Sequence, residues 1–341
     1  MLATAQLPGA GGFGYYPAMP SGKHRRAFAI GVDIGGRSAK IALVRDDGII
    51  VQRDQRPLDG TMSLSAVVGL LADGIRGMIE AAKKHRAKPL GAGVVMPGYL
   101  DETLQRVQLV ANMPNLTGTP FPRRLARAVP LPVQFDVDAN AAALGEYHFG
   151  AGRGVRRLLV ATLGTGIGGG VILDGKVLRV RNHVAGSLGH VIVNPDGLRC
   201  QCGARGCLEM YASARGFERV ANETADRHPH GRLARLRRKR GQLSGPELAE
   251  AIRAGDAAAR AVVDRCCRWL AAGIETWCVI YMPERVLLGG GVAAIGRPLL
   301  RSVRESFRDI AQPYVLERTT IDLAALGNDA GMIGAASLWF R

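Results

Sequence analysis

The sequence lacks an apolar run long enough to cross a membrane. Hydrophobic residues make up 47% of its 341 positions, but glycine, proline or charged residues interrupt every apolar stretch before the roughly eighteen residues that a spanning helix needs. The first 26 residues also lack the apolar segment and the small-residue cleavage site of an export signal. We therefore expect no membrane association and a cytoplasmic chain with two packed domains.

Residues 1–26 are instead rich in glycine, proline and small side chains, and they end in the basic sequence Lys-His-Arg-Arg. This composition predicts a disordered basic tail. The strand-like run AFAIGVDIG follows directly and places the start of the folded part near Ala27.

Cysteine is scarce, with six residues in the chain. Cys266, Cys267 and Cys278 fall in one apolar segment, RCCRWLAAGIETWCVI, whose spacing predicts a buried helix face that carries free thiols. Free thiols of this kind are typical of a reducing compartment.

The other three cysteines lie close to a histidine in the pattern H-x9-C-x-C-x4-C, formed by His190, Cys200, Cys202 and Cys207. Three thiolates and one imidazole are the ligands of a closed tetrahedral zinc site. Gly203 and Gly206 favour this interpretation, because a short loop can wrap one ion only where the backbone adopts positive φ. Alternatives are three buried or reactive cysteines beside an unrelated histidine, or a disulfide among them.

Acidic residues are also in deficit, with 29 Asp and Glu against 45 Lys and Arg and a net charge of +16. Part of the excess is concentrated in residues 228–241, HPHGRLARLRRKRG. A polyanion partner and a merely solvated surface are both consistent with this run. No helix-turn-helix pattern and no aromatic residues between the arginines accompany it, so we expect no nucleic-acid partner.

Two segments, AFAIGVDIGGRSAKIALV and RLLVATLGTGIGGGVILDGKVL, each read as strand, glycine turn and strand. Glycine lets backbone N–H groups approach an anion without interference from Cβ, so each turn is suited to part of a nucleotide's phosphate chain. Neither turn matches the Walker or dinucleotide fingerprints. Their duplication predicts two similar halves with a cleft between them.

Together these segments resemble the ROK group (repressors, open reading frames and sugar kinases) of the actin-like ATPase superfamily, from about Ala27 to the C-terminus. The resemblance rests on DIGG at 33–36, PNL at 114–116, DAN at 138–140, GTGIGGG at 164–170, the cysteine loop, LLGGGVA at 287–293 and NDAGMIGAA at 328–336.

The resemblance implies an α/β fold of two ribonuclease-H-like domains, residues 27–140 and 141–341, with an interdomain cleft and a structural zinc loop. The closing helix either stays in the second domain or returns to the first. By similarity, ATP and Mg²⁺ bind at the glycine motifs, with Asp33 acting on magnesium through water. The implied ATP and magnesium residues are Asp33, Gly35, Gly36, Arg37, Lys40, Gly164, Thr165, Gly166, Gly168, Gly289, Gly290 and Gly291.

Asp138 lies where the family keeps its catalytic base, between the strand-like LPVQFDV and a helical alanine run. A carboxylate there accepts the proton of a hydroxyl as its oxygen attacks the γ-phosphorus of ATP. The alternative is a helix N-cap. The implied sugar contacts are Asn115, Asp138, Ser187, His190 and Glu209, although Asn115 would also suit a turn. The zinc would order the segment that carries His190 and Glu209.

Three departures from the family pattern bear on the substrate. Arg37 replaces the threonine of DIGGT, Val137 replaces the asparagine of NDAN, and Ser187 replaces the glutamate of ExGH. The last two remove groups that grip sugar hydroxyls, and a site built to bond a hydroxyl discriminates strongly against a mismatched ligand.

We therefore expect an ATP-dependent kinase acting on the primary hydroxyl of a modified sugar, an aminosugar or a C7-cyclitol rather than plain glucose. The alternative is a non-catalytic ligand sensor, although the family's repressors carry a DNA-binding domain and a 26-residue tail is too short for one. Polyphosphate in place of ATP is a further alternative. Self-association as a dimer or tetramer is expected from the family.

Overall fold

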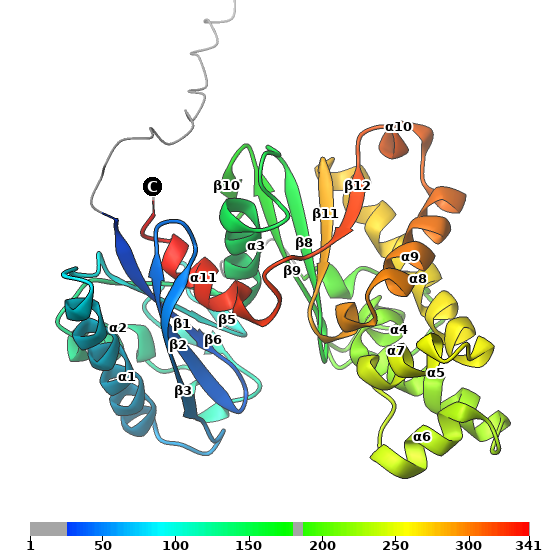
Figure 1. Cartoon of the computed structure of the whole chain (residues 1–341), viewed down its shortest axis with the longest axis horizontal. Coiled ribbons are helices and arrows are strands. Elements are labelled where there is room, and N and C mark those ends of the chain that lie inside the picture. The colour runs from blue at the N-terminus through cyan, green and yellow to red at the C-terminus, as the bar shows by residue number, and fades with distance from the viewer. Residues whose placement is uncertain (1–25, 180–186, 341) are drawn as a thin grey trace, which may run out of the picture.

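Two five-stranded sheets with the same strand pattern form the framework of the molecule (Figure 1). The computed structural model describes residues 26–179 and 187–340, so the tail predicted for residues 1–26 lies outside the described residues except for Arg26. In each sheet an antiparallel meander of three strands is followed by two parallel strands. This repeat confirms the prediction of two α/β halves.

The N-terminal sheet has the order β3-β2-β1-β4-β7. Its strands are β1 (Phe28–Ile34), β2 (Ser38–Arg45), β3 (Ile50–Pro57), β4 (Ala92–Met96) and β7 (Val133–Val137). Helices α1 (Leu64–Lys84) and α2 (Phe121–Ala128) cover one face, with an apolar stripe on α1 packed against alternate residues of β1 and β2. A two-stranded ribbon, β5 (Tyr99–Leu100) and β6 (Val107–Leu109), extends this lobe beyond β4.

The C-terminal sheet has the order β10-β9-β8-β11-β12. Its strands are β8 (Leu158–Leu163), β9 (Ile167–Leu173), β10 (Lys176–Val177), β11 (Arg285–Gly289) and β12 (Thr320–Leu323). A helical layer covers one face: α4 (Glu209–Ala212), α5 (Ala214–Arg227), α6 (Arg232–Arg240), α7 (Gly245–Arg253), α8 (Ala257–Tyr281), α9 (Arg297–Ile310) and α10 (Pro313–Leu316).

The long helix α8 carries the apolar cysteine segment. Cys266, Cys267 and Cys278 are fully buried in the core and free of disulfides, as the sequence predicts. Within the described residues, no helix has the length and apolar character that a membrane span requires.

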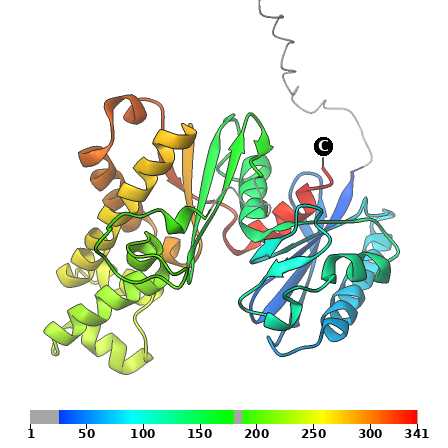
Figure 2. The same cartoon turned by 180° about the vertical axis from the view of Figure 1, so that it is seen from behind.

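Two helices of small residues, α3 (Asp138–Phe149) and α11 (Ala330–Ser337), cross between the sheets (Figures 1 and 2). Alanine and glycine let these backbones approach closely: a Cβ on Gly334 would lie 1.8 Å from the carbonyl oxygen of Ala141. Likewise α11 packs directly on the N-terminal sheet, where a Cβ on Gly31 would lie 1.9 Å from the carbonyl oxygen of Met332. The boundary expected near residue 140 falls inside α3, and we propose that α3 and α11 form a layer shared by both lobes.

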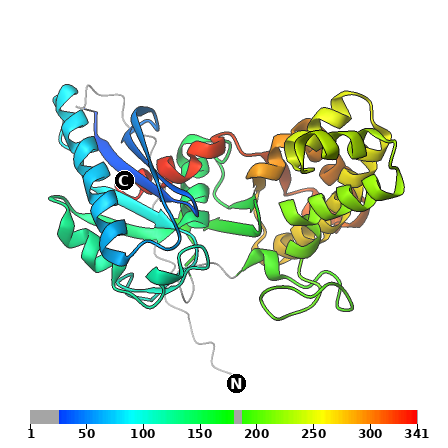
Figure 3. The same ribbon diagram turned by 90° about the horizontal axis from the view of Figure 1, so that it is seen from below.

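Two chain segments cross between the lobes (Figure 3), and the buried carboxylate of Glu146 joins them. It accepts hydrogen bonds from the backbone N–H groups of Ala151, at 2.9 Å, Ala325, at 3.1 Å, and Leu326, at 2.7 Å. Ala151 follows α3, whereas Ala325 and Leu326 lead from β12 to α11. One side chain therefore holds both of the segments that connect the lobes.

We expect Glu146→Ala to lower the free energy of unfolding by about 3 kcal/mol or more, because three backbone donors lose a buried acceptor. Glu146→Gln keeps one acceptor oxygen and should lose less. Chemical denaturation of both variants checks this, and equal stability of Glu146→Ala and the wild type would contradict the role given to this carboxylate.

Candidate active site

A cavity of about 170 Å³ between the two lobes brings together residues that the sequence predicted separately. Asp33, Lys40 and Asp138 line it from the N-terminal side, and Thr162, Gly289 and Gly290 line it from the C-terminal sheet. The crossing segment that leads into α11 closes one wall. Carboxylates, an ammonium group and glycine backbone thus face the same space.

The first glycine turn connects β1 and β2, as predicted from the sequence. The N–H of Gly35 donates to the carbonyl oxygen of Ser38 at 2.9 Å, and the register of the hairpin sets Asp33 directly across from Lys40. Arg37 at the turn is exposed, and no carboxylate of the described residues pairs with it. Its guanidinium is available to an anion that approaches the turn.

Asp138 is the first residue of α3, at the carboxyl end of β7. Val137 occupies the N-cap position, and the Oδ1 atom of Asp138 accepts only a local hydrogen bond from the N–H of Ala139 at 2.8 Å. The alternative interpretation of Asp138 as the N-cap therefore does not hold. Although solvent reaches the side chain, surrounding protein weakens its hydration and raises the pKa of its carboxyl group. An accessible carboxylate with a raised pKa suits a general base.

Asp33 shares this environment. Burial, together with the nearby charge of Asp138, raises the pKa of Asp33 to about 6, and Lys40 opposes part of this rise. Two carboxylates whose ionised forms disfavour each other are stabilised by a cation, and oxygen ligands are those that Mg²⁺ prefers. The donor set therefore fits a hydrated magnesium ion.

We expect Asp33→Asn to stabilise the nucleotide-free protein above pH 6. Because the folded-state pKa of Asp33 lies above its unfolded value of 3.8, ionisation of Asp33 costs stability as the pH rises between these values, and asparagine removes that cost. In magnesium-free buffer at pH 8 the gain should be about 1–3 kcal/mol, and at pH 3.5 it should vanish. Thermal unfolding at both pH values checks this, and a pH-independent difference would contradict it.

The second glycine turn joins β8 and β9 and lies beside the third glycine motif. The N–H of Gly164 donates to the carbonyl oxygen of Gly166 at 2.9 Å, and Thr165 is exposed at the tip. Gly290 has a φ of 82°, and a Cβ there would lie 2.6 Å from the carbonyl oxygen of Leu163. Gly291 then begins a short 3-10 helix, Gly291–Ile295. The close approach explains why this motif is made of glycine.

Gly168 on β9 and Gly166 in the turn before it make room for neighbouring side chains. A Cβ on Gly168 would lie 2.8 Å from Oγ1 of Thr162, which lines the cavity. A Cβ on Gly166 would lie 2.3 Å from Oε2 of Glu209. Glu209 accepts a hydrogen bond from the N–H of Ile167 at 2.9 Å, so the turn and the segment after the cysteines hold each other in place.

His190, Cys200, Cys202 and Cys207 converge, with their ligand atoms all within 4.8 Å of one another. The two closest contacts, Cys202 Sγ to Cys207 Sγ and Cys200 Sγ to His190 Nδ1, are each 3.6 Å. These are too long for a disulfide, and all three thiols are free. A tetrahedral zinc ion with Zn–S bonds of about 2.3 Å requires sulfur atoms about 3.8 Å apart. The residues therefore fit zinc.

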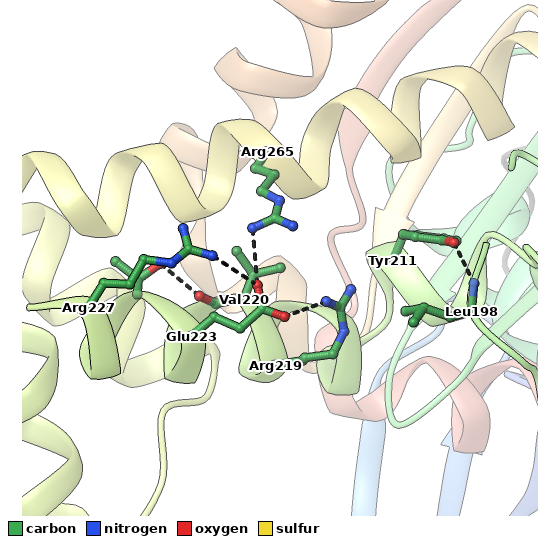
Figure 4. A network of polar contacts seen from close by, with 8 residues as sticks. Leu198, Tyr211, Arg219, Val220, Glu223, Arg227 and Arg265 are labelled. Atoms are coloured by element: carbon green, nitrogen blue, oxygen red, sulfur yellow. Dashed lines mark hydrogen bonds and ion pairs between the residues drawn. The ribbon is translucent and has the colours of Figure 1, made fainter. Parts of the chain in front are cut away.

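The backbone of this loop takes the form predicted from its glycines. Gly203 and Gly206 have φ values of 95° and 75°, and a Cβ on Gly206 would lie 1.6 Å from the carbonyl oxygen of Asn194. The hydroxyl of Tyr211 accepts a hydrogen bond from the N–H of Leu198 at 2.8 Å, which ties the loop to α4 (Figure 4). The loop ends two residues before Glu209, so its order determines where that carboxylate lies.

Two contacts that the sequence did not predict join the lobes near Asp138. The hydroxyl groups of Tyr99 and Ser187 lie 3.1 Å apart. The fully buried carboxylate of Asp136 accepts hydrogen bonds from the guanidinium of Arg179. Ser187 is one of the three departures from the family pattern. Where the family pattern has a glutamate carboxylate, this chain therefore has the hydroxyl of Ser187 beside that of Tyr99.

Of the predicted substrate contacts, Asp138 lines the cavity, whereas Asn115, Ser187, His190 and Glu209 do not. The amide of Asn115 donates to the carbonyl oxygen of Thr61 at 2.8 Å, and Asn115 does not line the cavity. Asn112 lies against the first glycine turn instead, 3.1 Å from where a Cβ of Gly36 would be. The side chain of Val137 is buried. Asn112, which precedes the PNL motif, is therefore a candidate that sequence reasoning missed.

Comparison with known proteins places these features in a family. The model of the ROK family matches residues 29–341. A glucokinase of Halalkalibacterium halodurans is 35% identical over 310 residues, which are 91% of this chain and 94% of that protein. An N-acetylmannosamine kinase of Salmonella typhi is 29% identical, over 91% of this chain and 97% of that one.

A solved structure extends the similarity to three dimensions. The crystal structure of a ROK family glucokinase from Streptomyces griseus, in complex with glucose and AMPPNP, superimposes with a TM-score of 0.77 at 34% identity. The match covers 92% of this chain and 99% of that one. Fold and family thus agree over nearly the whole chain.

Proposed function

Because the chain belongs to the ROK family, we propose that it is an ATP-dependent kinase that phosphorylates a primary hydroxyl of a sugar-like acceptor. The relatives named above are sugar kinases, which supports a phosphotransferase acting on a sugar hydroxyl. The observation that carries the proposal is the convergence of Asp33, Lys40 and Asp138 on one cavity between two sheets that each bear a glycine turn.

In the proposed reaction Asp138 accepts the proton of the acceptor hydroxyl while the hydroxyl oxygen attacks the γ-phosphorus of ATP and the bond to the β-phosphate oxygen breaks. Lys40 and the backbone N–H groups of the glycine turns are placed to balance the phosphate charge. Asp33 would hold a hydrated magnesium ion, which would supply further charge neutralisation. Phosphoryl transfer depends mainly on such positioning, which the buried contacts of Glu146 between the lobes support.

The acceptor side supports a ligand other than plain glucose. Ser187 carries a neutral hydroxyl where the family pattern has a carboxylate, and this hydroxyl already lies 3.1 Å from Tyr99. Buried Val137 offers no hydrogen bond. We propose that the acceptor is an N-acetylated or otherwise modified sugar, an aminosugar or a C7-cyclitol. The hydroxyl pattern of such a molecule does not require the asparagine and glutamate that Val137 and Ser187 replace.

An ATP-consumption screen over glucose, mannose, N-acetylated and amino hexoses and C7-cyclitols tests this proposal. We expect a modified acceptor to exceed glucose in kcat/KM, since a mismatched hydroxyl site commonly discriminates by about tenfold or more. Ser187→Glu should shift the ratio toward glucose by about the same factor, because it restores a charged hydroxyl partner at an exposed position.

Ser187→Gln is the matched control, as it adds bulk without charge. A Ser187→Gln variant that gains glucose activity equally would contradict a role for the carboxylate. If folded, zinc-loaded protein consumes no ATP with any acceptor of the panel, the second candidate function, a ligand sensor, is favoured. The specific observation behind this candidate is the exposed Arg37 in the first glycine turn.

A further inference from the structure

The basic run at residues 228–241 organises a loop rather than presenting free charge along its helix. On α6, Arg235 donates to the carbonyl oxygen of His230 and Arg238 donates to that of Pro229, at 3.1 Å for Arg238. Arg237 pairs with Asp226 at 2.7 Å, and Arg240 lies 3.6 Å from Glu250. Arg235 and Arg238 therefore hold the preceding loop, whereas Arg237 and Arg240 join α6 to α5 and α7.

That loop borders a solvent-open cavity of about 410 Å³. It lies among α5, α6 and the start of α8, at the end of the C-terminal lobe away from the N-terminal lobe (Figures 1 and 3). The size falls within the range of small-molecule sites. Its polar lining includes Thr224, Arg227, His228, His230, Arg232 and Asp256.

The charge inside this cavity is unbalanced. Arg232 is exposed, and no group of the described residues forms an ion pair or a hydrogen bond with its side chain. Arg227 lies 3.8 Å from Glu223, but Glu223 also pairs with Arg219 at 2.7 Å and with Arg265 at 3.1 Å (Figure 4). One carboxylate shared among three guanidinium groups leaves a net positive charge beside the cavity.

Asp256 is the one acidic residue in the lining, and its carboxylate is engaged elsewhere. It accepts hydrogen bonds from the N–H groups of Ala258, at 2.8 Å, and Ala259, at 3.4 Å, as the N-cap of α8. On the opposite side α6 begins at Gly231, an N-cap without a side chain, so its first N–H groups are not capped by a side chain. Guanidinium groups, imidazole N–H donors and uncapped amide groups are the donor set for a phosphate.

We propose that this cavity binds a small phosphate-bearing molecule with two or more negative charges, at a site separate from the catalytic cleft. A hollow of this size fits a small molecule better than an extended nucleic-acid strand, and no Phe, Tyr or Trp lines it for base stacking. The inference goes beyond the proposed kinase reaction, which uses none of these residues.

Isothermal titration of the full-length, zinc-loaded protein with inorganic pyrophosphate tests the site. The same titration of Lys40→Glu separates binding in the catalytic cleft from binding in this cavity, because Lys40 lines the cleft and not the cavity. We expect one pyrophosphate per chain, with binding weakened about tenfold or more in Arg232→Glu and measurably in His230→Ala, because charge-assisted hydrogen bonds are lost. Lys239→Glu is the matched control, since Lys239 lies on the same helix, is exposed and does not line the cavity.

Two outcomes would overturn the proposal. If Lys239→Glu and Arg232→Glu weaken pyrophosphate binding equally, the binding reflects the general positive charge of α6 rather than a site in the cavity. Absence of pyrophosphate binding would show that the cavity holds no such ligand. This conclusion would stand even if single-stranded RNA bound to α6. Thermal unfolding of each variant confirms that Arg232→Glu and His230→Ala remain folded, so that a loss of binding is attributable to the cavity.

Discussion

Asp138→Asn is expected to lower kcat by about 10² to 10⁴, the range that a positioned general base contributes. The same change should leave thermal stability equal or higher, because weak hydration raises the pKa of the Asp138 carboxyl group and a neutral amide avoids that penalty. In the wild type the base works only when ionised, so turnover should fall as the pH drops through this raised pKa. Steady-state kinetics over pH 5–9 together with thermal unfolding check both expectations.

Asp136→Asn is the matched control two residues away. It breaks a pair in which Asp136 is fully buried and the Arg179 side chain is 36% exposed, so we expect a loss of about 2–4 kcal/mol in the free energy of unfolding. One variant should thus lose turnover while keeping stability, and the other should lose stability. An Asp138→Asn protein that phosphorylates its acceptor at the wild-type rate would remove Asp138 from the chemistry.

Cys202→Ser is expected to abolish stoichiometric zinc binding and to lower the melting temperature by about 5 °C or more. Cys202 is exposed, so serine removes no buried surface, and any destabilisation reports the lost ligand. Because the loop leads directly into Glu209, which holds Ile167 of the second glycine turn, kcat/KM should fall by about 10². Metal analysis, thermal unfolding and kinetics on one preparation measure the three effects.

Arg205→Ala, an exposed change in the same loop, is the control and should retain zinc, stability and activity. Restoration of the Cys202→Ser protein by excess zinc would show weakened rather than lost coordination. Full activity of a metal-free wild type would contradict the structural role, since the loop would then keep its shape without the ion.

Features that depend on residues close in sequence could be predicted before the fold was known. The cluster of three cysteines and one histidine follows from a spacing within 18 residues, and each glycine turn follows from two strands joined directly. Asp138 could be placed because a strand and an alanine-rich helix flank it. In these cases the local pattern alone restricts the backbone, so the sequence is sufficient.

Contacts between distant segments escaped prediction. Tyr99 and Ser187 are 88 positions apart, and Glu146 and Leu326 are 180 apart. Neither pair leaves a periodic or spaced signal in the sequence, because the contact exists only once two sheets and two crossing helices are in place. Asn112 and Asn115 are equally plausible as motif residues, and only the packing of Asn112 against Gly36 distinguishes them.

The contacts of the basic run at residues 228–241 also could not be predicted from the sequence. Its charge was visible in the sequence, but the carbonyl groups that Arg235 and Arg238 contact became visible only with the loop. Charge density alone favoured either a solvated surface or a polyanion partner. The geometry shows instead that most of these arginines make contacts within the protein, while Arg232 lines a cavity.

The placement of α11 has a consequence for biosynthesis. Met332 and Ile333 cover apolar residues of β1 and β2, including Ala29 and Val44, which are made some 300 residues earlier. Until α11 has been translated, this apolar face of the N-terminal sheet therefore stays exposed to solvent. Native assembly of the first lobe can finish only after the codons of α11 are read, so a nascent chain paused before them should be a chaperone substrate.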